Sequence, residues 1–281
     1  MLDKLQNIDR RIVYLLFFIV TTIPFINPIP LSVQTAEYTQ ATYDLIEKLK
    51  PGDVVLIDIR FSPQSAGEMV PPYKALLSHI ASRPGVKILW FCTSFNGVTY
   101  MDMGIRQVEA MGKAYGKDIV GFGYLAGEEM ACAAVAQDLR KAFPMDSRGN
   151  RTDSLEAAST VKTAKDLALI LQVADGGMGV LTWVRQGYVP FGTKIVSILG
   201  QTMIPANLPY YQGKQAAGLI SGLQGAAEYE QLLKTPGRGS ACLGAQTFGH
   251  IYVIILLLTA NIAYIIKKTG APAQPKGGRA R

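Results

Sequence analysis

Two long stretches without a charged side chain limit the folds open to this chain of 281 residues. One runs from Ile12 to Ala36, and the other, which holds few titratable groups of any kind, runs from Gly239 to Ile266. About 20 consecutive apolar residues are enough to cross a bilayer as a helix. We therefore expect transmembrane helices at 12–31 and 247–266, separated by a large domain at 37–238.

The first stretch also has the basic start and apolar middle of a cleaved signal peptide. Its apolar run is long for a signal peptide, and Thr35-Ala36-Glu37 is the nearest approach to a cleavage site. These features favour an uncleaved anchor. The prolines that begin at Pro24 are expected to end or kink the helix near Ile23.

The positive charge of the chain is concentrated in its two tails. The whole chain carries +7, of which residues 1–11 carry +1 and residues 267–281 carry +5, so residues 12–266 hold the remaining +1. Basic residues that flank membrane spans stay on the cytoplasmic side. This predicts a protein of the cell membrane with both termini in the cytoplasm and its main domain extracytoplasmic. The basic tail is explained by topology, so nucleic acid is not expected as a partner.

The middle domain alternates short β-branched runs with segments of helical periodicity. Such alternation predicts a Rossmann-like α/β domain of three layers around a largely parallel sheet. The expected strands are 54–59, 86–92, 119–125, 166–174 and 194–200. The expected helices are 37–50, 69–83, 98–116, 128–143, 206–217 and 226–234. The polar segment 144–165 is long for a connection, which indicates a functional loop or a short helix near Ser154–Ser159.

Ligands of open α/β sheets bind beyond the carboxyl ends of the strands. The residues that follow the expected strands are small, polar and rich in hydroxyl groups, which suits a small polar ligand. The same residue types also cap helices and form turns, and for each residue alone that explanation is sufficient. The candidate ligand-binding residues are Ser62, Ser65, Thr93, Ser94, Asn96, Glu128, Asp175, Gly176, Gly177 and Gln201.

The chemistry-bearing residues offer little support for a metal or a cofactor. The chain has two histidines and three widely spaced cysteines, which excludes the usual structural zinc sites. Cys92 and Cys132 could pair in an oxidising compartment, but each lies in an apolar run, which favours buried free thiols. We expect neither a metal nor a cofactor.

Catalytic motifs are weak. A Ser-His-Asp triad needs a histidine, and the domain offers only His79, which lies in an expected helix as a structural residue. A Ser-Lys dyad remains open, with Ser62, Ser65 or Ser94 as the nucleophile, although no lysine is singled out. No nucleophile elbow and no Walker phosphate loop occur.

Residues 121–126 match a dinucleotide-binding fingerprint, with Gly121, Gly123 and Ala126 in the motif positions. A genuine fingerprint belongs to the first strand of its unit, whereas this one follows the third. Glu128 and Glu129 would repel a pyrophosphate at the start of the next helix. The glycines are better explained by close packing and a tight turn.

Two segments carry a resemblance. Tyr115-Gly116-Lys117-Asp118 leading into GFGYLAGEE, and GLISGLQGAAEYEQLL at 218–233, resemble bacterial membrane proteins that combine an α/β domain with flanking transmembrane segments. The resemblance covers much of residues 50–234; the family has no assigned activity and supplies no functional residues. The order of IVSILG, a polar turn and YYQGKQAAGL is similar to periplasmic solute-binding domains.

These observations favour a binding or assembly subunit of a membrane complex over an enzyme. The expected partners are the membrane and either further copies of the chain or other membrane subunits. An anchored serine hydrolase of the Ser-Lys kind is the alternative, and a nucleotide-binding domain that faces the cytoplasm is the third.

Overall fold

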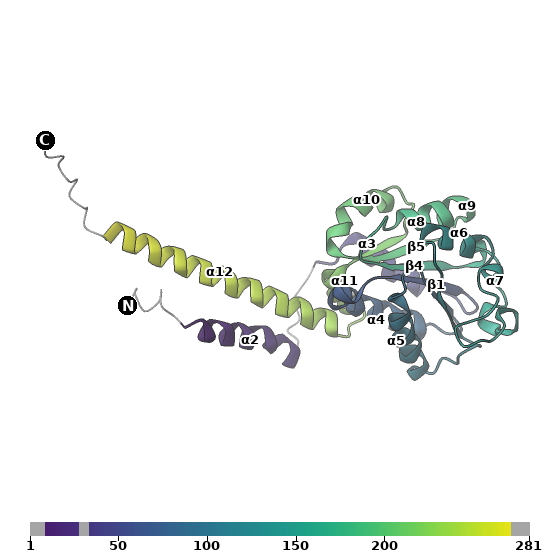
Figure 1. Cartoon of the computed structure of the whole chain (residues 1–281), viewed down its shortest axis with the longest axis horizontal. Helices are drawn as coiled ribbons and strands as arrows, with labels where there is room; N and C mark the ends of the chain where they lie inside the picture. Colours follow the sequence, from purple (N-terminus) through teal and green to yellow (C-terminus); the bar gives the residue numbers. More distant parts are fainter. Residues whose placement is uncertain (1–8, 28–33, 271–281) are drawn as a thin grey trace. The chain divides into compact units, whose positions relative to one another are not determined.

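A computed structural model describes residues 9–27 and 34–270. The chain divides into two compact units, one of residues 31–240 and one that combines residues 1–30 with 241–281. The first unit contains the whole sheet and its helices and is called the α/β domain below (Figure 1). Parts of the expected tails at 1–11 and 267–281, namely residues 1–8 and 271–281, lie outside the described residues, as does the end of the first expected span at 28–31.

Six parallel strands form the sheet of the α/β domain in the order β3-β2-β1-β4-β5-β6. The chain therefore starts in the middle of the sheet, builds outward to β3, and then returns to the other side of β1. This is the doubly wound order, and it confirms the predicted α/β class. The strands are β1 (Val54–Arg60), β2 (Lys87–Cys92), β3 (Ile119–Tyr124), β4 (Leu169–Ala174), β5 (Ile195–Leu199) and β6 (Gly218–Ser221).

The central strand β1 shows why the sheet is covered on both faces. Val55, Ile57 and Ile59 belong to one buried apolar cluster, whereas Val54 and Leu56 belong to the other. Side chains alternate between the faces of a strand, so a continuous apolar run needs a layer on each side. Helices on both sides supply these layers (Figure 1).

One face is covered mainly by regular helices that contribute to the first cluster. These are α3 (Glu37–Glu47), α4 (Ala66–Ser82), α5 (Gly97–Ala110) and α11 (Gly222–Leu232). The other face is covered by shorter pieces and irregular turns that contribute to the second cluster. These include α6 (Glu129–Gln137), α7 (Leu139–Ala142), α8 (Leu181–Trp183), a π-helical turn η5 (Val184–Tyr188), α9 (Val189–Phe191) and α10 (Ile204–Gln212).

Several local predictions differ from the structure. The helix expected over 206–217 ends at Gln212, and the strand expected over 166–174 begins at Leu169. The helix expected over 128–143 is broken at Asp138, whose carboxylate accepts a hydrogen bond from Lys141 N and so caps a separate short helix. The helix expected over 98–116 ends at Ala110. Residues 218–221, too short and glycine-rich to be predicted as a strand, form β6 because pairing with β5 satisfies their backbone groups.

The long polar connection at 144–165 contains short 3₁₀ turns, η2 (Thr152–Ser154), η3 (Glu156–Ala158) and η4 (Ala164–Asp166). Asp146 organises its first part by accepting hydrogen bonds from Tyr115 Oη, Arg148 N and Asn150 N. Ser147 N donates to Gly121 O on the edge strand β3 at 2.9 Å. The connection therefore covers part of an otherwise open sheet edge, which accounts for its length.

The second unit contains two helices, α2 (Arg10–Ile26) and α12 (Arg238–Gly270), of which α12 begins in the α/β domain. Tyr252 Oη donates a hydrogen bond to Val13 O at 2.9 Å, and the Tyr252 ring lies 5.9 Å from that of Phe17. In the described part of the chain, one helix is long and apolar enough to cross a membrane, namely α12 over Arg238–Ile266. The span predicted at 12–31 is not supported by this criterion, because its described part, α2, has 17 residues.

Candidate functional site

The sheet order places a crevice between β1 and β4. The chain leaves the carboxyl end of β1 toward α4 on one face, and it leaves β4 toward α8 on the other face. Connections that depart in opposite directions open a gap at the edge of the sheet, where doubly wound proteins hold their ligands. Residues after β1, β2, β3 and β4 line a crevice of about 300 Å³ at this place. Its lining residues are Arg60, Thr93, Ser94, Glu128, Glu129, Asp175, Gly176, Gly177, Met178 and Thr182.

Asp175 ties the loop after β4 to the loop after β1. Its Oδ2 atom accepts hydrogen bonds from Ser62 N at 2.8 Å, from Ser62 Oγ at 2.7 Å and from Ser65 Oγ. Partial burial would raise the pKa of Asp175, but the donated hydrogen bonds outweigh burial and hold it below its usual value. The carboxylate therefore remains ionised at the crevice wall.

A buried ion pair supports the floor of the crevice. Asp58 is fully buried, and its Oδ2 accepts hydrogen bonds from Arg60 Nη2 at 2.6 Å and from Trp183 Nε1 at 2.9 Å. Its Oδ1 accepts a hydrogen bond from Thr93 Oγ1 at 3.0 Å. Asp58 and Arg60 point to the same face because they are two residues apart in β1. Arg60 Nε and Cys132 Sγ also donate to Oδ2, so five donated hydrogen bonds compensate the buried carboxylate.

Arg60 also joins the pair to neighbouring groups. Its guanidinium donates to Cys132 Sγ at 3.0 Å and to Thr182 Oγ1 at 3.3 Å. Burial alone would lower the pKa of Arg60, but the Asp58 carboxylate more than offsets it and the pKa is raised. Burial raises the pKa of the Cys132 thiol well above its usual value. Cys92 lies in the opposite core cluster and both thiols are free, in agreement with the prediction of buried thiols.

Glu128 adopts a backbone conformation that favours glycine. Its φ is 46° and its ψ −107°, and it follows Gly127, whose φ is 115°. A non-glycine residue in such a region costs about 1–3 kcal/mol, and such costs concentrate at functional sites. The Glu128 side chain lies at the crevice wall and is exposed. This backbone strain is a second reason, beside its place in the crevice, to treat Glu128 as a candidate functional residue.

The structure brings together most of the predicted ligand-binding residues. Thr93, Ser94, Glu128, Asp175, Gly176 and Gly177 line the crevice, and Ser62 and Ser65 bind Asp175. Two others lie outside the lining. Asn96 precedes α5 and is exposed, and Gln201 follows β5, where its backbone N donates to Glu68 Oε1.

Sequence reasoning missed Asp58 and Thr182 and gave Arg60 no specific role. The available signal for the pair was the acid and base at alternate positions of the otherwise apolar run VVLIDIR. Thr182 lies in a short helix that follows a glycine-rich loop, and no spacing rule marks it. Its place in the crevice depends on the path of the chain after β4.

The arrangement gives no lysine partner for a serine nucleophile. The hydroxyls of Ser62 and Ser65 donate to Asp175, and no lysine is present among the residues that line the crevice with Ser94. His79 is buried elsewhere, with Nδ1 2.7 Å from Tyr229 Oη and Nε2 2.8 Å from Glu47 Oε1. Both of its ring nitrogens are occupied, as expected for a structural histidine.

The fingerprint glycines serve packing and backbone geometry. A Cβ on Gly121 would lie 2.7 Å from Ile105 Cδ1, so α5 approaches β3 too closely for a side chain. Gly123 has a φ of 87° and lies in β3 where its register with β2 shifts. Within the described ranges, no group of three or more histidine, cysteine or acidic residues is placed to hold a metal ion.

Comparison with known proteins does not assign the chain to a family. No protein-family model matches the sequence, and no curated protein matches it. The crevice and the candidate span are the two features of the described chain that bear on its function.

Proposed function

We propose that this chain is a membrane-anchored binding or assembly subunit whose α/β domain lies outside the cytoplasm. Its crevice takes a small cationic ligand that donates hydrogen bonds, such as an organic amine. The observation that carries this proposal is the excess of carboxylates in the crevice.

Three carboxylates line the crevice, those of Glu128, Glu129 and Asp175, against one guanidinium. That guanidinium, of Arg60, is already paired with Asp58. Arg185 Nη1 lies 3.7 Å from Glu129 Oε2 and partly offsets the negative charge of Glu129. A concave site with an excess of one sign raises the local concentration of the opposite ion. Charge-assisted hydrogen bonds from ammonium groups to carboxylates would then fix the ligand.

The same charges oppose the nucleotide alternative. Glu128 and Glu129 lie at the start of α6, where a phosphate would otherwise be attracted by the helix N-terminus. The fingerprint glycines lie on the edge strand β3, two strands away from the β1–β4 gap. The carboxylates of Glu128 and Glu129, which follow β3, would repel an anionic ligand.

The membrane anchor rests on α12. The part of α12 that is long and apolar enough to cross a membrane extends from Arg238 to Ile266. The residues that follow it are rich in lysine and arginine and contain no acidic residue. The positive-inside rule then favours a cytoplasmic C-terminus and an extracytoplasmic α/β domain. With 17 residues, α2 spans about 25 Å, which is shorter than the hydrocarbon core of about 30 Å.

The contact of α2 with α12 supports its inclusion in the membrane unit as the second span of this proposal. The Tyr252 hydrogen bond to a backbone carbonyl of α2 occupies a polar group that lipid could not satisfy. Anchors at both ends of the domain would restrict its orientation, which suits assembly with further copies or with other membrane subunits.

We expect putrescine, a small diamine, to bind the full chain purified in detergent, and 1,4-butanediol and ATP not to bind. Glu128→Gln combined with Asp175→Asn removes two crevice carboxylates and is expected to weaken putrescine binding at least tenfold, or about 1.4 kcal/mol. Gln201→Ala, which changes a polar residue outside the crevice, is the matched control. Isothermal titration measures all three ligands on all three proteins.

Glu128→Gly separates the effect of the strained backbone at this position from the effect of its carboxylate on ligand binding. It relieves the positive φ, so the melting temperature should stay the same or rise, while putrescine binding falls. Equal binding of putrescine and butanediol, or binding of ATP in preference to both, would show that the carboxylates do not select the ligand.

A further inference from the structure

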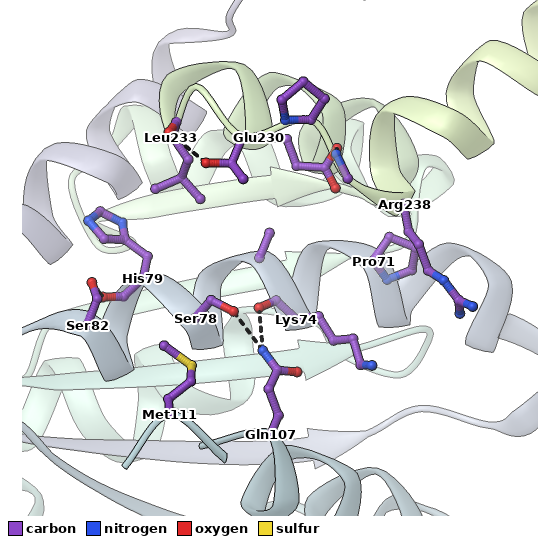
Figure 2. A pocket seen from close by; sticks show the side chains of 14 residues that line it. Pro71, Lys74, Ser78, His79, Ser82, Gln107, Met111, Glu230, Leu233 and Arg238 are labelled. Carbon is purple, nitrogen blue, oxygen red and sulfur yellow. Dashed lines mark hydrogen bonds between the residues drawn. The ribbon is translucent and has the colours of Figure 1, made fainter. Parts of the chain in front are cut away.

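A second cavity lies on the face of the sheet covered by α4, α5 and α11. Its volume is about 600 Å³, within the range of small-molecule sites. Much of the lining is apolar and comes from α4, from the end of α5, from the end of α11 and from the segment before α12 (Figure 2). The apolar members are Pro71, Ala75, Met111, Leu233 and Pro236. Residues of the crevice do not take part in it.

Two basic side chains lie at one end of this cavity. Figure 2 shows Lys74 and Arg238 at the end where Pro71 lies, and His79 and Ser82 at the opposite end. Within the described ranges, neither Lys74 nor Arg238 has a carboxylate within salt-bridge distance. Both positive charges therefore remain available to a ligand.

The one carboxylate of the lining is occupied. Glu230 Oε2 accepts hydrogen bonds from Gly237 N at 2.9 Å and from Ser240 N at 2.8 Å, and Oε1 accepts one from Gly239 N at 2.7 Å. These donors belong to the segment that leads into α12, so the charge of Glu230 stabilises a helix start. It is not free to neutralise the basic end.

Gln107 adds an unsatisfied acceptor to the wall. Its Nε2 donates to Lys74 O at 3.0 Å and to Ser78 Oγ at 2.7 Å, which fixes the amide (Figure 2). Its Oε1 is buried and has no hydrogen-bond donor in the part of the chain that the structure describes. Buried acceptors are normally satisfied, and a hydroxyl donor on a ligand could fill this position after a small side-chain movement.

The chain itself connects the cavity to the candidate membrane helix. Arg238 lines the cavity and is also the first residue of α12. If α12 spans, Arg238 lies at the level where phospholipid headgroups begin. The cavity and the candidate span are therefore linked by the chain itself at Arg238.

We propose that this cavity binds an anionic phospholipid of the surrounding membrane. An acyl chain occupies the apolar part, and the phosphate lies between Lys74 and Arg238. The guanidinium of Arg238 suits bidentate contact with phosphate oxygens, and the Lys74 ammonium adds a point charge. A glycerol headgroup also carries the hydroxyl donors that Gln107 lacks. This site is separate from the crevice and extends the proposed function to lipid recognition.

Native mass spectrometry of the full chain, extracted in mild detergent and incubated with defined lipids, tests this site. Phosphatidylglycerol is expected to remain bound in preference to phosphatidylcholine. Lys74→Glu with Arg238→Glu should reduce the retained phosphatidylglycerol at least tenfold. Lys141→Glu with Lys162→Glu, two exposed lysines on the other face of the sheet, applies the same charge change as a control and should retain the lipid.

Ala75→Phe fills the apolar part of the cavity without changing its charge and should also expel the lipid. A melting curve confirms that this variant is folded. Equal retention of both lipids, or equal losses in the Lys74/Arg238 pair and in the control, would overturn the proposal. Retention of a free fatty acid in place of phosphatidylglycerol would also contradict it. Putrescine binding is measured on the same samples, so a failure of the crevice and a failure of this cavity can be told apart.

Discussion

Replacing Asp58 by alanine is expected to lower the free energy of unfolding by about 3–5 kcal/mol. The variant leaves the guanidinium of Arg60, whose side chain is 12% exposed, without its carboxylate partner. It also removes the acceptor for Trp183 Nε1 and Thr93 Oγ1. Guanidinium unfolding of the full chain in detergent, followed by tryptophan fluorescence, measures the loss.

A paired replacement shows whether the effect comes from the unpaired charge. Asp58→Leu with Arg60→Met removes both ions and should recover much of the lost stability, since apolar substitutes for a buried pair are often tolerated. Asp53→Ala, at a partly exposed position before β1, is the control for loss of a carboxylate and should cost far less. A loss below about 1 kcal/mol for Asp58→Ala would mean that the pair is not a structural support.

Two arginines in the middle of α12, together with two in α2, are expected to release the protein from the membrane. Leu257→Arg with Leu258→Arg places two charges in the apolar length of the helix, at about 2.5–3.5 kcal/mol each for insertion. Both side chains are exposed, so the change does not disturb a core. After alkaline extraction, the wild type should stay in the membrane pellet, and the variant that also carries Phe17→Arg and Phe18→Arg should move to the supernatant.

Leu257→Ala with Leu258→Ala controls for the loss of the leucines and should stay in the pellet. The corresponding change in the other helix, Phe17→Arg with Phe18→Arg, asks whether α2 contributes to anchoring. Retention in the pellet of the variant that carries all four arginines would show that these helices do not anchor the chain. Full release by the α2 arginines alone would show that α2 is the anchor and α12 is not.

The fold was predictable where a long segment has one dominant pattern. The run VVLIDI became β1 because six consecutive buried positions leave few alternatives. The four-residue strand β6 could not be predicted, since its identity comes from backbone pairing with β5 and not from its own side chains. The break at Asp138 was hidden by a strong helical pattern on both sides of a single capping residue.

The sequence predicted the candidate site only as the group of residues that follow the strands, without showing which of them line one crevice. The rule that ligands lie beyond the carboxyl edge placed Asp175 and Glu128 in the candidate list, although they are far apart in the sequence. It could not separate them from Gln201, because that distinction depends on where the sheet order reverses. The buried partners Asp58 and Trp183 meet through folding alone and leave no signal in sequence spacing.

The most direct test of the membrane-anchored binding domain is the labelling of Ser94→Cys in intact cells by a membrane-impermeant maleimide. Ser94 lines the crevice, and the native Cys92 and Cys132 are buried. The partly exposed Cys242 is replaced by serine in both chains, so the chain without Ser94→Cys serves as the blank. We expect the new thiol to be labelled from outside and putrescine to slow the labelling. Labelling only in inverted vesicles, or labelling that putrescine leaves unchanged, would contradict this expectation.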